Sequence, residues 1–186
     1  MAQKVAKSTG EVPFIRTSDL ANWELKIDPK QGVSAAIAGP IAARQDLAPA
    51  DILMVRDGTY LVGTTAMLTE DDVVTGMIIQ SHLYRVRVIK PDTLSPYLLL
   101  AVLNSPIVKR QIRAKQFTQD IIDTLGGRLS ELRLPIPKDE AIRQEIARRT
   151  QDIVETRAKL RREAREVARQ VGGSPDAEKE ELAEIL

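Results

Sequence analysis

The chain has 186 residues, of which 43% are hydrophobic and 28% charged, so it is long enough for one folded domain with an appendage. Its lack of cysteine excludes a disulfide framework and thiolate metal sites, and is typical of a protein in a reducing cytoplasm. The net charge of +1 excludes an overall basic field, so any surface that binds nucleic acid has to be a local patch.

The first segment, residues 1–11, is polar and is expected to be a flexible N-terminus. Its lysines are not followed by an apolar run, which excludes a signal peptide. No later stretch approaches the roughly 20 apolar residues that cross a bilayer, so no membrane partner is expected. Together with the absence of cysteine, these features predict a cytoplasmic protein.

Residues 12–138 are expected to form one domain whose first part consists mainly of strands. The predicted strands are residues 12–15, 52–55, 60–62, 77–79 and 83–89, with a turn at Asp57-Gly58 between the second and the third. In the last of these strands, Arg85 and Arg87 alternate with apolar residues. A period of two places the two arginines on one face and the apolar side chains on the other.

Helices are predicted from residue 95 onward. Ser95 can cap a helix that has Pro96 in its first turn, and a second helix runs from 106 to about 115. Gly126-Gly127 marks a turn, and residues 129–137 hold a final strand-like piece. The expected fold class is α+β: a mixed, mainly β domain with packed helices, followed by one long helix of the coiled-coil type.

A single long helix is predicted over residues 139–171, because neither proline nor glycine interrupts the chain there. At about 1.5 Å per residue it spans roughly 50 Å, whereas a domain of about 130 residues has a radius of gyration of about 14 Å. Much of the helix is therefore expected to project from the domain. Residues 172–186 are expected to form a short acidic C-terminal tail.

An apolar stripe runs along this helix. Ile146, Ile153, Leu160 and Val167 recur every seven residues, and Ile142 lies one turn before them. Heptad spacing is typical of a seam that faces another helix. Two interpretations stay open: the helix packs on its own domain, or it pairs with the same helix of a second copy or with a helix of another subunit.

Five segments carry a recognisable pattern. They are residues 12–20, 50–59 (ADILMVRDGT, compared with gDIL-x-x-R-x-G-T), 79–83, 94–106 (LSPYLLLAVLNSP, compared with l-x-p-x-y-L-x-x-x-L-N-S) and 129–146. In this order they resemble the target-recognition domain of type I restriction-modification specificity subunits, over about residues 11–170. The same type of domain is also found fused behind N6-adenine DNA methyltransferases.

The resemblance implies a mixed α/β domain that clamps double-stranded DNA, and a long helix that packs antiparallel with a second such helix. That rod spaces two recognition domains and docks adenine-specific DNA methyltransferase subunits and, in a restriction complex, the restriction subunit. The implied target is two short sequences separated by a fixed gap. The family usually has this unit twice, with a strand and helix before the segment at 12–20. The resemblance therefore leads us to expect either a half-subunit that pairs, or a fragment of a larger specificity protein or DNA methyltransferase.

DNA recognition needs cations for the phosphates and hydrogen-bonding side chains for the base edges. The DNA-binding candidates are Arg16, Thr17, Ser18, Arg56, Thr59, Tyr60, Ser81, His82, Lys109, Arg113, Lys115, Gln116 and Arg128. Arg56, next to a turn, suits guanine O6 and N7, with pairing to Asp57 or Asp51 as the structural alternative. The alternatives for the others are a strand-end turn for the first three, a structural role for the single histidine, and a solvated face for the basic helix residues.

No catalytic or metal-binding pattern is found in the sequence, and no cofactor is expected. His82 lies in no nucleophile motif, the triplet Glu70-Asp71-Asp72 is expected to be a solvated turn, and the adenine-methyltransferase motif (Asn/Asp-Pro-Pro-Tyr/Phe) does not occur. The prediction is a non-catalytic DNA-specificity subunit that depends on partner chains for methyl transfer. The rival hypothesis is a protein-interaction scaffold that works through the long helix and whose globular part has lost DNA affinity.

Overall fold

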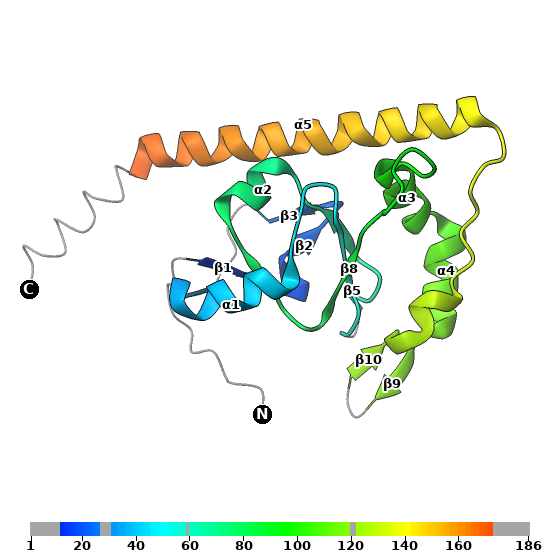
Figure 1. Ribbon diagram of the computed structural model, residues 1–186, viewed down its shortest axis with the longest axis horizontal. Coiled ribbons are helices and arrows are strands. Elements are labelled where there is room, and N and C mark those ends of the chain that lie inside the picture. The colour runs from blue at the N-terminus through cyan, green and yellow to red at the C-terminus, as the bar shows by residue number, and fades with distance from the viewer. Residues whose placement is uncertain (1–11, 27–30, 59, 120–121, 173–186) are drawn as a thin grey trace, which may run out of the picture.

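The computed structural model describes residues 12–26, 31–58, 60–119 and 122–172, which form a head of small sheets and short helices with one long helix along it (Figure 1). The strands are β1 Val12–Ile15, β2 Leu20–Ala21, β3 Glu24–Leu25, β4 Gly32–Val33, β5 Ile52–Val55, β6 Thr65–Met67, β7 Ile78–Ile79, β8 Leu83–Val86, β9 Phe117–Gln119 and β10 Ile122–Thr124. The helices are α1 Ala35–Gln45, α2 Glu70–Thr75, α3 Pro96–Leu103, α4 Pro106–Lys115 and α5 Glu140–Gly172, with 3-10 turns at Thr17–Asp19 and Gly126–Glu131. The predicted N-terminus 1–11 and the tail after Gly172 lie outside the described residues.

The mixed α+β class is confirmed, but the prediction of a mainly β domain is wrong, since helix accounts for 51% and strand for 19%. α1 and α2 have no counterpart among the predicted elements. Gly39 and Pro40, which usually break helices, lie inside α1. The prediction that Glu70-Asp71-Asp72 is a solvated turn is wrong, because the triplet begins α2 and Asp72 is buried. Residues 60–62 and 129–137, predicted as strands, pair with no strand among the described residues.

β5 lies at the centre of the head, between β6 and β8 in an antiparallel sheet. Its side chains alternate between two apolar clusters: Ile52 and Met54 face α3 and α4, whereas Leu53 and Val55 face β1 and the β2–β3 hairpin. Because both faces of the strand are covered, its sequence is a continuous apolar run rather than an alternation. This two-sided burial makes the sheet the rigid support on which the connections at its ends are held.

A second small sheet has the order β4-β1-β7, in which β1 runs parallel to β7. α1 covers it, with Ala38 packed against Val33 and Ile78. The side chain of Gln45, at the end of α1, makes two hydrogen bonds to the backbone of Ile79, with its Nε2 donating at 2.6 Å and its Oε1 accepting at 2.8 Å. α1 is thereby fixed to the strand that leads toward His82.

The predicted alternation in β8 and the residues after it is confirmed. Tyr84, Val86 and Val88 pack against the α3 side of the core. On the opposite face, Arg87 donates to both oxygens of the fully buried Asp51, at 2.6 and 2.8 Å. A buried carboxylate requires such partners, because an unpaired charge in the interior is strongly unfavourable.

α3 begins at Pro96 as predicted, with Ser95 at the N-cap position, although the Ser95 side chain makes no capping hydrogen bond. The helix is apolar on nearly every side because it lies between the β5 sheet and α5. α4 is amphipathic and buries Val108 and Ile112. Gly63, at a φ of +82°, lets the β5–β6 connection approach α4 closely, since a Cβ there would lie 2.9 Å from the Cδ1 of Ile112.

α5 confirms the predicted long helix, with bounds one residue from those expected. The prediction that it projects is wrong, because it lies along the head and contacts α3 and β3 (Figure 1). Its buried side chains, Thr150, Val154 and Arg161, form a face about a quarter turn from the apolar stripe. None of the described helices combines the length and apolar character needed to cross a bilayer.

Candidate nucleic-acid interface

Several of the predicted DNA-binding residues lie on segments that are joined by backbone hydrogen bonds. The amide of Gln80 donates to Ile15 at the end of β1, and the amide of Arg56 donates to His82, both at 2.9 Å. Beyond β5, Gly58 donates to Asp123 of β10. The end of β1, the β7–β8 connection, the end of β5 and the β9–β10 hairpin therefore form one continuous edge. The hairpin lies on the side of the head opposite α5 (Figure 1).

Asp57 is the centre of a polar cluster on this edge, the Asp57 cluster, formed with Arg56, His82 and Thr124. Its carboxylate is 8% exposed and accepts from Arg56 Nε at 2.9 Å and from Thr124 Oγ1, and His82 Nδ1 lies 2.7 Å from its Oδ2. Burial alone would raise the pKa of Asp57, but the hydrogen bonds from Arg56, Thr124 and His82 outweigh it and lower the pKa to about 2.

The Asp57 cluster bears on two of the sequence hypotheses. Arg56 pairs with Asp57, as the structural alternative proposed, and not with Asp51, which Arg87 occupies. His82 is likewise tied to Asp57 by one ring nitrogen. Both side chains are still more than a third exposed, so they retain surface for a ligand while Asp57 fixes their orientation. Sequence reasoning missed Asp57 itself as the residue that organises the edge.

The candidates at the end of β1 have a structural partner too. Arg16 donates through Nε and Nη2 to the carboxylate of Asp19, at 3.2 and 3.3 Å, and its amide donates to the same group. This pairing closes the 3-10 turn in which Thr17 and Ser18 lie, so the turn alternative applies to Arg16. Ser18, like Ser81 on the neighbouring β7–β8 connection, remains exposed.

Four predicted residues come together in one hollow beside α4. Lys109, Arg113 and Gln116 line it from one side, and Tyr60 lines it from the β5–β6 connection. The volume of this α4 hollow is about 500 Å³, and its remaining lining residues are Val62, Thr64 and Ile112. Lys109, Arg113 and Gln116 share one face of the helix because they are four and seven residues apart. None of the lining residues is a carboxylate.

The two cations of the α4 hollow are electrostatically unbalanced. Lys109 Nζ donates to the backbone carbonyl of Gly63 at 2.5 Å, and burial, with a further contribution from Arg113, lowers the pKa of Lys109. No carboxylate of a described residue pairs with Arg113, whose side chain is exposed. A partly buried ammonium group with a second cation beside it is stabilised by an anion, so the α4 hollow is suited to a phosphate group.

The remaining basic candidates are committed to the fold. Lys115 pairs with Glu131 at 2.7 Å, and Arg128 donates to the carbonyl of Lys115 at 3.1 Å. The guanidinium of Arg128 also stacks over the ring of Phe117, 4.6 Å from its centroid. These contacts hold the β9–β10 hairpin and the turn after it against the end of α4. Thr59, another candidate, lies outside the described residues.

The apolar stripe on α5 is largely uncovered. Ile142, Ile153, Leu160 and Val167 are between 41% and 59% exposed, whereas Ile146 packs against the core beside α3. The head thus covers the neighbouring face of α5 and leaves four of the five stripe residues accessible. A helix can therefore pack on its own domain and still present this stripe, so the two interpretations of the sequence pattern are compatible.

No protein-family model matches the chain, and no curated protein matches it either. Within the described ranges, no group of three or more histidine, aspartate or glutamate side chains is placed to hold a metal ion.

Proposed function

We propose that the chain is a non-catalytic half-subunit that recognises a DNA sequence and directs a type I restriction-modification or related N6-adenine methylation complex to it. Its head contacts double-stranded DNA through the α4 hollow and the edge that carries the Asp57 cluster. Its apolar stripe contacts a second long helix. An adenine-specific DNA methyltransferase partner supplies methyl transfer, and a restriction subunit supplies cleavage.

The α4 hollow is the observation that carries this proposal. Tyr60, Lys109, Arg113 and Gln116 are candidates on sequence grounds alone, and they line one hollow without a carboxylate although they come from two separate segments. Cations neutralise phosphates, while a phenol and an amide can hydrogen-bond base edges or sugar. Because the net charge of the chain is only +1, a DNA-binding surface has to be a local basic patch, and the α4 hollow is such a patch.

The resemblance to specificity subunits supports the rest of the proposal. The segment 94–106 forms α3 and the start of α4, and the segment 129–146 leads into α5. In the proposed complex, α5 is the coiled-coil-type helix that pairs along its exposed stripe. Pairing of two copies then places two DNA edges at a fixed separation, as dimer geometry does in other DNA readers.

Selection of bound sites from a pool of random duplexes tests the proposal. The full chain is incubated with the pool, with and without an adenine-specific methyltransferase partner, and the retained duplexes are sequenced. We expect a short sequence to be enriched, and its affinity to fall steeply with salt. A pool retained without enrichment, or no retention at low salt, would contradict sequence recognition.

The exposed stripe also favours a second candidate, a protein-interaction scaffold that works through α5. Four partly exposed aliphatic side chains on one helix need a partner whether or not the head binds DNA. The scaffold hypothesis predicts that a partner binds the chain through α5 while no duplex is retained. A recognition-domain fragment of a larger DNA methyltransferase would instead retain specific duplexes but lose any association through the stripe.

A further inference from the structure

α5 is attached to the head in two physically different ways. In its proximal half, residues 140–154, the contacts are apolar: Val154 is buried, and Ile146 and Ala147 pack against the core beside α3. In the distal half, residues 155–172, no apolar side chain is buried, and the one buried residue is Arg161. The direction of the distal half therefore depends on polar contacts.

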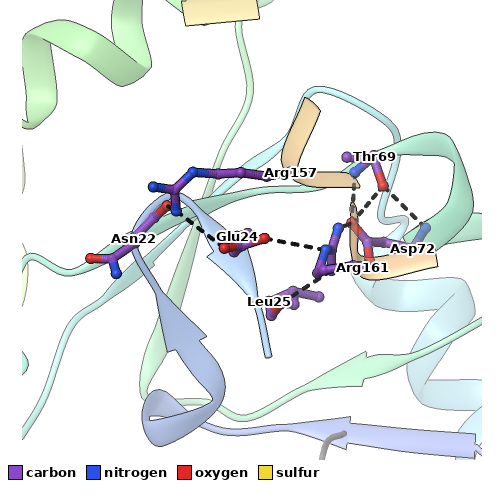
Figure 2. Close-up of polar contacts among 7 residues, drawn as sticks. All are labelled: Asn22, Glu24, Leu25, Thr69, Asp72, Arg157 and Arg161. Carbon is purple, nitrogen blue, oxygen red and sulfur yellow. Dashed lines mark hydrogen bonds and ion pairs between the residues drawn. The ribbon is translucent and has the colours of Figure 1, made fainter. Parts of the chain in front are cut away.

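Arg161 makes a buried, two-pronged ion pair with Asp72 of α2 (Figure 2). Its Nη1 lies 3.0 Å from Asp72 Oδ1 and its Nη2 lies 3.1 Å from Oδ2, and the two side chains are 6% and 3% exposed. Nη1 also donates to the carbonyl of Leu25, at 3.2 Å. The Nε of Arg161 lies 3.5 Å from Glu24 Oε2. Figure 2 shows the guanidinium held between α2 and β3.

Asp72 is itself held in a fixed orientation. Its Oδ2 accepts from the backbone amide of Thr69 at 2.9 Å and from the Thr69 hydroxyl at 2.7 Å, which forms the cap of α2. A second arginine on the same side of α5, Arg157, donates to the carbonyl of Asn22 at 2.6 Å and pairs with Glu24 at 3.1 Å (Figure 2). Both arginines therefore bind groups that the head already orients.

This geometry constrains α5 more than apolar packing can. Apolar contact has no preferred direction, whereas a planar guanidinium that meets a carboxylate through two parallel hydrogen bonds fixes the direction of approach. Because the pair is almost completely buried, salt screens it only weakly. Apolar packing holds the proximal half of α5 against α3, and the Arg161–Asp72 pair fixes where the distal half points.

We propose that Arg161 and Asp72 are positioning residues that set the angle of α5 on the head. This inference rests on the proposed function for its consequence: the angle sets where the DNA edge lies relative to a partner bound along the stripe. Loss of the pair loosens the distal half of α5 and leaves the α4 hollow intact, since that hollow is built from α4 and the β5–β6 connection. The pair thus determines the gap between two half-sites and not the affinity for one.

Distances between two spin labels test the positioning role without DNA. The chain has no cysteine, so cysteines introduced together at the exposed residues Ile37 of α1 and Gln170 of α5 are its only two labelling sites. The double variant Arg161→Met, Asp72→Asn removes the charges and keeps an acceptor for the Thr69 amide. We expect one narrow distance distribution in the parent chain and a clearly broader one in this variant. Dilution with unlabelled chain suppresses the distances between labels on two different copies.

A matched control replaces another arginine of the same helix. Arg148→Met breaks ion pairs only with Glu145 and Asp152 of α5 itself, so its distance distribution stays as narrow as that of the parent. Arg161→Lys keeps the charge and loses the two-pronged geometry, so it gives an intermediate width and serves if the double variant fails to fold. Equal widths in the parent chain and in every folded Arg161 variant would overturn the proposal.

Duplexes with two half-sites test the consequence for DNA. We expect the parent chain to prefer one gap length and the double variant to accept several gaps with similar affinity, while both bind a single half-site equally. If neither chain selects any duplex, the proposed function fails whatever the label distances show. If both select the same single gap, the proposed function stands and the positioning role is wrong.

Discussion

The basic side chains on two sides of the head are in opposite electrostatic situations. Under α5, Arg157, Arg161 and Arg162 each reach a carboxylate of the head. Along α4, Arg113 pairs with no carboxylate of a described residue, and Lys109 donates only to a backbone carbonyl. Nothing in the local sequence distinguishes these arginines, because both groups lie on helices rich in basic residues.

The difference separates two uses of positive charge. A buried pair contributes little net stability compared with apolar packing, yet removal of one partner is costly, so such a pair fixes geometry. An exposed, unpaired cation costs little to the fold and is available to displace counterions from a phosphate. The buried Arg161 therefore fixes the architecture of the chain, whereas the cations of the α4 hollow, Lys109 and Arg113, are the ones that the proposed function assigns to DNA.

The largest expected effect is on the α5 side. Asp72→Ala leaves Arg161 buried without its carboxylate and removes the acceptor of the Thr69 amide in the capping box of α2, so the free energy of unfolding falls by about 3–5 kcal/mol. Urea denaturation followed by circular dichroism measures this loss. Asp71→Ala is the matched control, because its partner Arg162 is exposed, and it changes stability by less than about 1 kcal/mol. Similar losses in both variants would break the distinction between buried and exposed pairs.

Arg56 lies between the two classes, since it is paired and yet partly exposed. If it reads a base, Arg56→Ala weakens binding to the selected sequence by about 1–3 kcal/mol and leaves binding to unrelated duplexes nearly unchanged. Fluorescence anisotropy with the selected duplex and a scrambled one measures both quantities. An equal loss on the two duplexes would show that Arg56 contacts a phosphate or only supports Asp57.

The Asp57 cluster predicts a pH dependence of stability. The pKa of Asp57 in the folded chain, about 2, is below its ordinary value, so its contribution is present above about pH 4 and is lost as the pH falls toward 2. The contribution is about 1–2 kcal/mol after allowance for solvent at the rim of the cluster. The difference in unfolding free energy between the parent chain and Asp57→Asn should therefore shrink by that amount between pH 5 and pH 2. A difference independent of pH would show that the ionised Asp57 carboxylate does not stabilise the fold.

The smallest expected effect on folding comes from the apolar stripe. Leu160 is 57% exposed, so Leu160→Glu changes the free energy of unfolding by no more than about 0.5 kcal/mol. The same substitution places a charge in the predicted seam and abolishes association with a second helix, which analytical ultracentrifugation measures. Unchanged self-association and unchanged binding of a methyltransferase partner would show that the stripe is not an interface.

The sequence predicted those elements whose pattern can be read from neighbouring residues. α5 was predictable because no glycine or proline interrupts it, and the placement of Arg85 and Arg87 on one common face followed from a period of two. α1 was not predictable, because Gly39 and Pro40 usually break a helix, and its support comes from the packing of Ala38 on Val33 and Ile78. Tertiary contacts override local propensity in such segments.

The candidate site was predictable in its members but not in their roles. Basic and polar residue types pointed to Lys109, Arg113 and Gln116, and their helical spacing predicts a common face. The burial of Asp72 could not be inferred, because its partner Arg161 is 89 residues away in the chain. Pairing also decides that Arg16, Lys115 and Arg128 support the fold, and sequence does not show which carboxylate or carbonyl each side chain reaches.

The salt dependence of DNA binding by two arginine variants of α4 tests the central claim most directly. Arg113 lines the α4 hollow, whereas Arg110 is an exposed neighbour on the same helix that lies outside it. If the hollow holds a DNA phosphate, Arg113→Ala weakens binding by about 1–2 kcal/mol and lowers the slope of log affinity against log salt by about 1, with Arg110→Ala close to the parent chain. Equal slopes and affinities for the parent chain and both variants would contradict a DNA-binding role for the α4 hollow.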